Sequence, residues 1–311
     1  MSLLVRSLLA RALMLAGLLT AWAAPTASAS GIYWSANGAI GRANLDGTGA
    51  NASFIPGVNA GEIAVDATSV YWTRNTGTIG RANLDGTAVN PNFISAIPGV
   101  SGVAADGSHV YWIRPGGESP TIGRANLDGT GIVETVVSGV GPDASDLAVD
   151  GSHLYWVNAG VSGVASANLD GTGVDEIVIV PGSCCYFNQI TDIAVGDSGL
   201  YYAYVGVPVH YMFPPTGAIE GGRGSISGTD LSPRGVALDE TFVYWTNLYP
   251  ASGIWRANLD FSGATLLISG GYGDIAVSPE PVPEPSAILL LMAGLVGLAY
   301  RQRRHAMPQS A

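Results

Sequence analysis

Apolar and polar residues alternate along most of this chain in short runs that end at Gly, Asp or Asn. Residues 63–66 read Ile-Ala-Val-Asp, a Tyr-Trp pair follows at 71–72, and Ile-Gly-Arg-Ala-Asn-Leu-Asp-Gly occupies 79–86. Runs with these bounds predict β-strands joined by tight turns. A composition of 47% apolar and 12% charged residues, with 43 Gly, fits strands and turns better than disorder. The pattern therefore predicts an all-β protein.

The Tyr-Trp pair marks an internal repeat. It occurs at 33–34, 71–72, 111–112, 155–156 and 244–245, with Tyr201-Tyr202 in the remaining place. Successive pairs lie 38 to 46 residues apart, and each unit contains three clear strands and a weaker fourth. A period of about forty residues with four strands is typical of a β-propeller blade. Six units predict a propeller of six four-stranded blades.

The two ends of the repeat region complete each other. The first unit begins at Gly31-Ile32-Tyr33 without a leading strand, while Asp274-Ile275-Ala276-Val277 stands alone after the sixth unit. We expect this last strand to complete the first blade, which closes the ring and removes exposed sheet edges. The predicted propeller covers residues 31–279.

The combined repeat resembles the YWTD repeat of low-density-lipoprotein-receptor-type propellers. One departure is consistent, because the Asp that the family places after Tyr-Trp-Thr is missing and with it the family's polar link between blades. The residues at that position are Ala36, Arg74, Arg114, Asn158, Tyr204 and Asn247. The repeated arginines Arg42, Arg81, Arg124 and Arg256 therefore need other partners.

The N-terminal residues 1–29 are typical of a secretion signal. Arg6 and Arg11 precede an apolar run over 12–24, and the small residues Ala27-Ser28-Ala29 follow. An A-x-A site predicts cleavage after Ala29, and the apolar run is short for a permanent span. An uncleaved anchor is the alternative.

The C-terminal residues 280–311 have a different character. Val282-Pro283-Glu284-Pro285 precedes an apolar run over 287–300, predicted as a short helix, and Arg301, Arg303 and Arg304 follow. Fourteen helical residues reach about 21 Å, less than a hydrocarbon core of about 30 Å. Arginines after such a run stay in the cytoplasm, which leaves the body outside.

This tail closely resembles the PEP-CTERM sorting signal. The resemblance implies recognition of Pro283, Glu284 and Pro285 by an exosortase, a membrane protease-transpeptidase of Gram-negative bacteria that often make extracellular polysaccharide. It also implies transient membrane association through 287–300, followed by display at the cell surface or release. An ordinary single-span anchor is the alternative.

Charge excludes one class of partner. Residues 31–280 carry 8 arginines against 23 of the 24 acids, a formal charge of −15. We expect no nucleic-acid binding, which requires cationic side chains against phosphates.

No cofactor is expected, although one pattern invites a calcium hypothesis. Five acids recur at the ends of the leading strands, namely Asp66, Asp106, Asp150, Asp197 and Asp239. Calcium needs six to eight oxygens converging on one ion, whereas equivalent repeat positions lie on a wide circle.

The repeat is interrupted in two places. Cys184 and Cys185, the only cysteines, are adjacent and could form a vicinal disulfide, stay reduced or bridge to another molecule. In the fifth unit, 18 residues separate Tyr201 from the next expected strand at Ile219, which predicts an inserted loop. An aromatic platform for a sugar ring or peptide is one interpretation, and a lid packed over blade edges is the other. The platform would consist of Tyr186, Phe187, Tyr202, Tyr204, His210, Tyr211 and Phe213.

Catalytic motifs are lacking. His109 and His153 lie in equivalent Gly-Ser-His turns, and no nucleophile elbow, zinc-type spacing or phosphate loop occurs. We therefore expect no catalytic residues and a non-catalytic surface, matrix or biofilm protein that binds an extracellular polysaccharide or protein. One alternative is a hydrolase, lactonase or lyase with a metal in the central channel. Another is a structural filler without a specific ligand.

Overall fold

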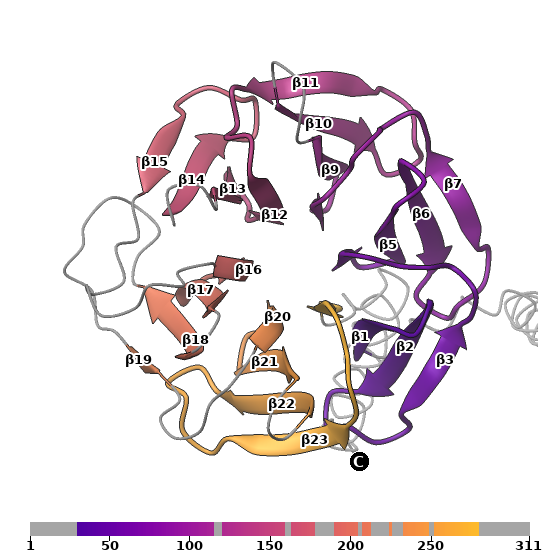
Figure 1. The fold of residues 1–311 in the computed structure, drawn as a ribbon, viewed down its shortest axis with the longest axis vertical. Coiled ribbons are helices and arrows are strands. Elements are labelled where there is room, and N and C mark those ends of the chain that lie inside the picture. The colour runs from indigo at the N-terminus through magenta and orange to yellow at the C-terminus, as the bar shows by residue number, and fades with distance from the viewer. Residues whose placement is uncertain are drawn as a thin grey trace, which may run out of the picture.

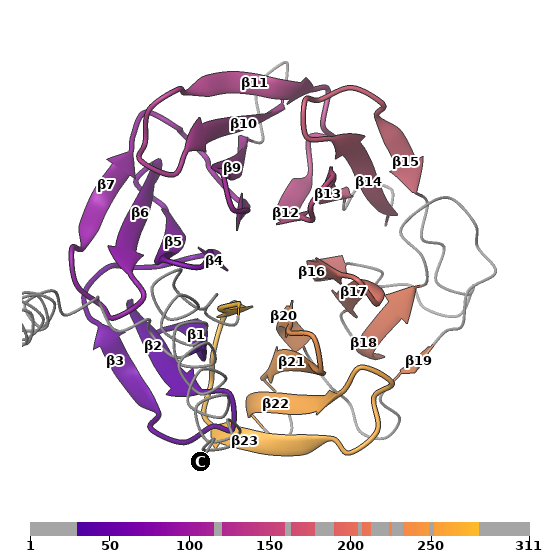
Figure 2. The same ribbon diagram turned by 180° about the vertical axis from the view of Figure 1, so that it is seen from behind.

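The computed structural model describes residues 30–114, 120–158, 163–177, 190–204, 207–212, 224–225, 233–248 and 252–279. These residues form six four-stranded antiparallel sheets arranged around a central axis (Figures 1 and 2). The prediction of an all-β propeller with four-stranded blades is confirmed. No helix long and apolar enough to cross a membrane occurs in this part of the chain.

Blades 1 to 3 follow one another along the chain. Blade 1 consists of β24 (Ile275–Val277), β1 (Gly31–Ala36), β2 (Ala39–Asn44) and β3 (Asn51–Ile55). Blade 2 consists of β4 (Ile63–Val65), β5 (Ser69–Arg74), β6 (Thr78–Asn83) and β7 (Asn90–Ile94). Blade 3 consists of β8 (Val103–Ala105), β9 (His109–Arg114), β10 (Thr121–Asn126) and β11 (Val133–Ser138).

Blades 4 to 6 continue the ring. Blade 4 consists of β12 (Ala144–Val149), β13 (His153–Asn158), β14 (Gly163–Asn168) and β15 (Asp175–Ile177). Blade 5 consists of β16 (Ile190–Gly196), β17 (Gly199–Tyr204), β18 (Val207–Met212) and β19 (Gly224–Ser225). Blade 6 consists of β20 (Pro233–Leu238), β21 (Phe242–Asn247), β22 (Gly253–Asn258) and β23 (Thr265–Ser269).

Blade 1 is built from both ends of the described chain, as the sequence predicted. Trp34 pairs with Ile275, and Ile32 pairs with Val277. The Gly31 N–H donates to Ser278 Oγ at 2.8 Å, and the Ser278 N–H donates to the Gly31 carbonyl at 2.9 Å. These hydrogen bonds fasten the last strand to the first and close the ring.

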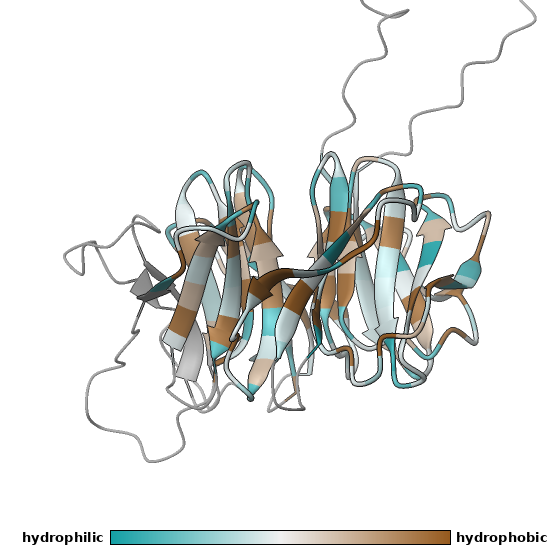
Figure 3. Ribbon diagram, turned by 90° about the horizontal axis from the view of Figure 1, so that it is seen from above, coloured by the Kyte–Doolittle hydropathy of each residue, from teal (hydrophilic) through white to brown (hydrophobic). Residues whose placement is uncertain are grey.

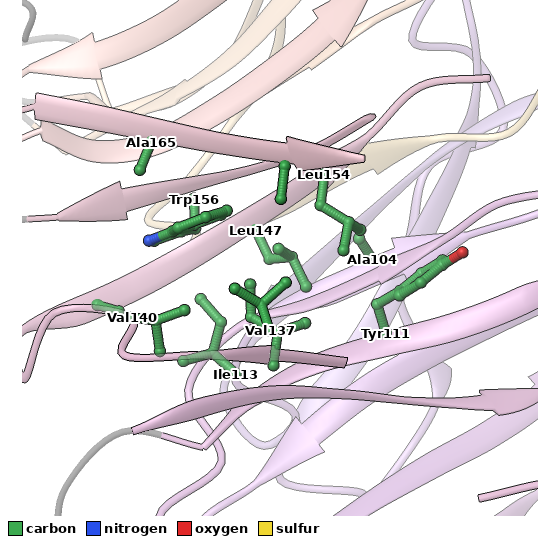
Figure 4. Packing of buried hydrophobic residues seen from close by; sticks show 12 residues of the cluster. Ala104, Tyr111, Ile113, Val137, Val140, Leu147, Leu154, Trp156 and Ala165 are labelled. Carbon is green, nitrogen blue, oxygen red and sulfur yellow. The ribbon is translucent and has the colours of Figure 1, made fainter. Parts of the chain in front are cut away.

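The core lies between neighbouring blades. Six clusters of buried apolar side chains each join two adjacent sheets. Figure 4 shows the cluster between blades 3 and 4, where Ile113 and Val137 meet Leu147 and Trp156. In the side view, hydrophobic residues band the strands and hydrophilic ones gather at the turns (Figure 3).

The glycine of Ile-Gly-Arg accommodates the Tyr-Trp tryptophan. Gly80 lies opposite Trp72 across the β5–β6 pair, and a Cβ at Gly80 would lie 2.1 Å from the Trp72 ring. Gly41 and Gly123 stand in the same relation to the tryptophans of blades 1 and 3. Blade 6 uses Trp255 instead, which stacks on Trp245 with ring centroids 6.1 Å apart.

Backbone carbonyls replace the missing family Asp as partners between blades. Arg124 donates to the Leu169 carbonyl of blade 4 at 2.9 Å, and Arg256 donates to the Leu45 carbonyl of blade 1 at 3.0 Å. Elsewhere a tyrosine makes the equivalent link, since the Tyr33 hydroxyl donates to the Leu84 carbonyl. The Asn-Leu-Asp-Gly turn of the next blade thus supplies the acceptor.

One sequence prediction about blade 5 is wrong. Residues 207–212, assigned to an inserted loop, form the third strand β18, which pairs with β17 from Leu200–Met212 to Tyr204–Val207. β17 ends at Tyr204 and β18 begins at Val207. The prediction failed because Val-Pro-Val-His-Tyr-Met shares no residues with Ile-Gly-Arg-Ala-Asn, although it has strand-like alternation.

We predict that Gly80→Ala destabilises the propeller by about 1 to 3 kcal/mol, because the added methyl overpacks a fully buried indole. Thermal or urea unfolding of the body measures this. Gly107→Ala is the matched control, since a Cβ there meets no atom within 4 Å. Equal stability of the two variants would show that Trp72 is not held against this glycine.

Candidate functional site

The innermost strand of every blade begins at the same face of the propeller. These strands are β24, β4, β8, β12, β16 and β20, and each packs against the next around the axis. In each of these strands, one apolar residue pairs with the second aromatic residue of the Tyr-Trp or Tyr-Tyr pair, and the residue directly before it occupies an equivalent position in all six blades. The six residues at this preceding position are Glu62, Gly102, Asp146, Asp192, Gly235 and Asp274.

The acids at this position form what we call the channel cluster: Glu62, Asp146, Asp192 and Asp274. Carboxylate oxygens of Glu62, Asp146 and Asp192 lie within 4.8 Å of one another. Asp146 and Asp192 are each only 4% exposed. Four negatively ionisable groups from blades 1, 2, 4 and 5 therefore meet at the axis.

Three of these carboxylates also fasten neighbouring blades together. Asp274 accepts from the N–H of its own neighbour Ile275 at 2.7 Å and from the N–H of Ile63 in blade 2. Asp192 repeats the arrangement, with the N–H of Ile193 at 2.9 Å and that of Val236 in blade 6. Each such carboxylate bridges two inner strands.

Asp146 forms the corresponding bridge from blade 4 to blade 5, accepting from the Ile193 N–H at 2.7 Å. At Gly235, the backbone of the next blade lies too close to leave room for a side chain. A Cβ there would lie 2.9 Å from the Ile275 nitrogen. The two ring glycines thus mark junctions where backbone packs on backbone.

Burial and mutual repulsion raise the pKa values of three carboxyl groups in the channel cluster. Burial raises the pKa of Glu62 well above its usual range, and the charges of Asp274 and Asp146 add to this effect. Burial, followed by the charge of Asp146, does the same to the pKa of Asp192. Burial and Asp146 raise the pKa of Asp274 to about 7, against hydrogen bonds from Ile63 and Ile275. The cluster therefore favours bound protons or a cation near neutral pH.

A cavity of about 510 Å³ opens at this end of the channel. Five blades contribute to its wall, which combines hydroxyl groups, two carboxylates and one guanidinium. The lining residues are Ser35, Gly61, Glu62, Ser145, Ile190, Thr191, Arg234, Gly273 and Asp274. Hydroxyl, carboxylate and guanidinium groups can bind the hydroxyls of a sugar, and the carboxylates alone can bind a hard cation such as Ca²⁺.

The acids singled out from the sequence have a different role. Asp66 accepts from the N–H groups of Thr68 and Ser69 and from the Tyr71 hydroxyl at 3.0 Å. Asp106, Asp150 and Asp239 accept the equivalent tyrosine hydroxyl of their own blades. These four acids hold the turns after the inner strands of blades 2, 3, 4 and 6, at the opposite end from the channel cluster.

The sequence contains a signal for the channel cluster that the motif-based predictions did not include. Four of six residues directly before the inner-strand apolar run are acidic. The periodic acids at the strand ends drew attention because they belong to the repeated motif. The channel position holds Glu in one blade, Asp in three and Gly in two, so it escapes a search for identical repeats.

Only part of the predicted aromatic platform lies in the described part of the chain. Tyr202 is 6% exposed and packs with Tyr155, Val157 and Leu200, so its inclusion was wrong. The strands place Tyr204 in β17 and His210 and Tyr211 in β18. Cys184, Cys185, Tyr186, Phe187 and Phe213 lie outside the described residues, as do Ala27, Ala29 and the whole sorting tail. The vicinal disulfide and the rest of the platform stay predictions.

Comparison with known proteins identifies the tail. Residues 281–304 match the PEP-CTERM protein-sorting motif. This motif implies processing by an exosortase, export, and a surface or extracellular location in a Gram-negative bacterium. No curated protein sequence matches the chain.

Solved structures support the fold. A chain in the crystal structure of a nidogen/laminin complex is similar at a TM-score of 0.63 and 19% identity, over 80% of this chain and 98% of that one. An extracellular domain assigned to a hybrid two-component system of B. thetaiotaomicron has a TM-score of 0.51 and 13% identity, over 78% of this chain and 32% of that one. At these identities the similarity shows the fold alone, which is a YWTD-like propeller.

We predict that Glu62→Gln stabilises the folded protein at pH 8 by about 1 kcal/mol or more, because it removes one charge from a crowded cluster. The raised pKa values mean that the folded state binds more protons than the unfolded state. Stability is therefore highest below pH 4 to 5 for this contribution and falls as pH rises through 7.

Urea unfolding at several pH values, with a chelator present, measures this effect. The variant should lose stability less steeply between pH 5 and pH 8 than the unmodified protein. Glu240→Gln, which neutralises an exposed acid, is the control. Identical pH profiles for Glu62→Gln and the unmodified protein would refute the coupling of these carboxylates.

Proposed function

We propose that this protein is an exosortase-sorted extracellular protein whose propeller acts as a non-catalytic scaffold and binds a polysaccharide at the mouth of its central channel. The observation that carries the proposal is the cavity of about 510 Å³, whose wall collects hydroxyl, carboxylate and guanidinium groups from five blades. A cavity of this size and polarity fits one or two sugar rings.

The cavity wall matches sugar hydroxyls, which both donate and accept hydrogen bonds. Glu62 and Asp274 are acceptors when ionised, Arg234 is a donor, and Thr191 can be either. Arg234 is exposed and lies at the position just before Gly235, so it can approach a ligand without disturbing the inner strands. The sorting motif at residues 281–304 supports an extracellular location for the propeller.

A protein partner is the other form of the same scaffold function. The similar chain from the nidogen/laminin structure was crystallised in a complex, so a propeller of this fold supports protein binding. The glycan array and polysaccharide pull-down described below test the polysaccharide alone, so absence of binding in both favours a protein partner.

A metal-dependent hydrolase, lactonase or lyase is the second candidate. The observation that favours it is the approach of three carboxylates within 4.8 Å, a donor set that suits Ca²⁺ or Mg²⁺. Turnover of lactone or glycoside substrates that requires added Ca²⁺ and disappears in Asp146→Asn would support the enzyme. Calcium that stabilises the fold without turnover would support a structural cation.

We predict that Arg234→Ala lowers polysaccharide affinity at least about tenfold, equivalent to about 1.4 kcal/mol, by removing the one cationic group of the described cavity wall. A glycan array followed by pull-down with extracellular polysaccharide measures this. Arg114→Ala, at an exposed arginine outside the cavity, is the control. Binding that survives Arg234→Ala but is lost in Tyr211→Ala with Phe213→Ala would move the ligand to the aromatic platform.

We also predict that Glu284→Ala blocks processing of the tail, because Glu284 is the charged residue between the two prolines of the matched motif. In the native host, immunoblots of membrane and extracellular fractions should show the full-length form accumulating in the membrane. Glu280→Ala, just before the matched residues, is the control. Unchanged release of the Glu284 variant would contradict exosortase sorting.

A further inference from the structure

The direction of β24 separates the cavity from the sorting tail. Asp274, which lines the cavity, directly precedes the first residue of β24, and Pro279 follows two residues after its last. The chain therefore enters β24 at one face of the propeller, the channel-mouth face, and leaves at the other. We call the second face the terminal face, and it also carries the Asn-Leu-Asp-Gly turns, since Asn44 pairs with Gly31.

Both ends of the propeller lie at one point of the terminal face. The Ser30 hydroxyl is 3.5 Å from the Pro279 carbonyl, and Gly31 and Ser278 exchange hydrogen bonds beside them. Six residues, 25–30, separate Gly31 from the apolar run of the secretion signal, and seven residues, 280–286, separate Pro279 from that of the tail. Each apolar segment is thus attached to the same spot through a short connection.

The tail is too short for the propeller to turn over while the tail is held in a membrane. Seven extended residues reach about 24 Å. To reach the opposite face, a chain that leaves the innermost strand must first cross three strand spacings, about 14 Å, to the edge of the blade. It must then run along the outer strand for about 17 Å. This path is longer than the reach of the seven residues. The channel-mouth face therefore stays away from the bilayer.

The turns of the terminal face carry negative charges. Asp46, Asp85, Asp128 and Asp170 occupy equivalent exposed turns, and each accepts hydrogen bonds from the threonine two residues later. These hydrogen bonds lower the pKa of each carboxyl group, so the group is ionised at neutral pH. Repulsion from anionic lipid headgroups opposes direct contact of this face with the bilayer, so the short connection to the tail, and not attraction to the surface, sets the orientation.

We propose that the propeller meets the membrane that carries its processing protease in one orientation, with the terminal face inward and the cavity mouth outward. This inference rests on the sorting part of the proposed function, and it identifies the surface that faces the protease. It also means that the cavity is open to a ligand before the tail is removed, so processing is not required for binding.

A pair of spin labels at opposite ends of one strand tests the orientation. Ala67→Cys lies on the terminal face and Asn75→Cys on the channel-mouth face, both exposed and flanking β5 of blade 2. Each is introduced with Cys184→Ser and Cys185→Ser, and the protein with its tail retained is reconstituted into vesicles of phosphatidylethanolamine and phosphatidylglycerol that contain a nickel-chelating lipid. We expect several-fold stronger relaxation of the label at 67 than at 75.

Two controls make the outcome decisive. Insertion of about twenty Gly/Ser residues after Pro279 should abolish the difference, because the connection then spans the propeller. Vesicle flotation checks separately that the tail holds the body. Equal or reversed relaxation in floated protein overturns the orientation and leaves sorting intact, whereas failure to float contradicts membrane attachment through 287–300 itself.

Discussion

Three residue pairs between β24 and β1 join parts of the chain that are more than 240 residues apart, and every other feature of the propeller depends on this closure. Without it, six sheets form an open arc with an unpaired edge at each end. With it, the innermost strands encircle an axis and their first residues converge. The same pairing brings Ser30 to Pro279, so one interaction fixes the ring, the channel and the exit of the tail.

The convergence has an electrostatic cost that the blade junctions partly offset. Carboxylates at the axis repel one another and lose hydration, which raises the pKa values of Glu62, Asp192 and Asp274. Backbone N–H groups of the next blade compensate three of the acids. Glu62 has the longer side chain and lines the cavity, which makes it the member of the cluster best placed to respond to a proton, cation or ligand.

The cavity and the end of the last inner strand lie at opposite faces of the propeller. The cavity lies where inner strands begin, and the sorting tail leaves where the last inner strand ends. This arrangement follows from strand direction and needs no special device. A rigid ring can therefore hold the cavity on one side while the connection to the sorting motif leaves from the other.

The repeat itself could be predicted from sequence, because its Tyr-Trp pairs, glycines and turn residues satisfy local requirements that recur every blade. Gly80 illustrates this, since its absent side chain is dictated by the indole directly across one strand pair. Blade 5 could not be delimited, because β18 has strand-like alternation without the repeat's residues. Tyr202 was misplaced for a related reason, since burial depends on the neighbouring blade.

The sequence by itself determined the all-β propeller, the closing strand and the identity of the sorting tail, since each is written in contiguous residues with local physical causes. Only the tertiary structure decided that Glu62, Asp146, Asp192 and Asp274 meet, because they come from four blades and share no motif. It also decided which face carries the cavity. Proximity across a closed ring depends on strand direction and blade packing, which no short stretch of sequence contains.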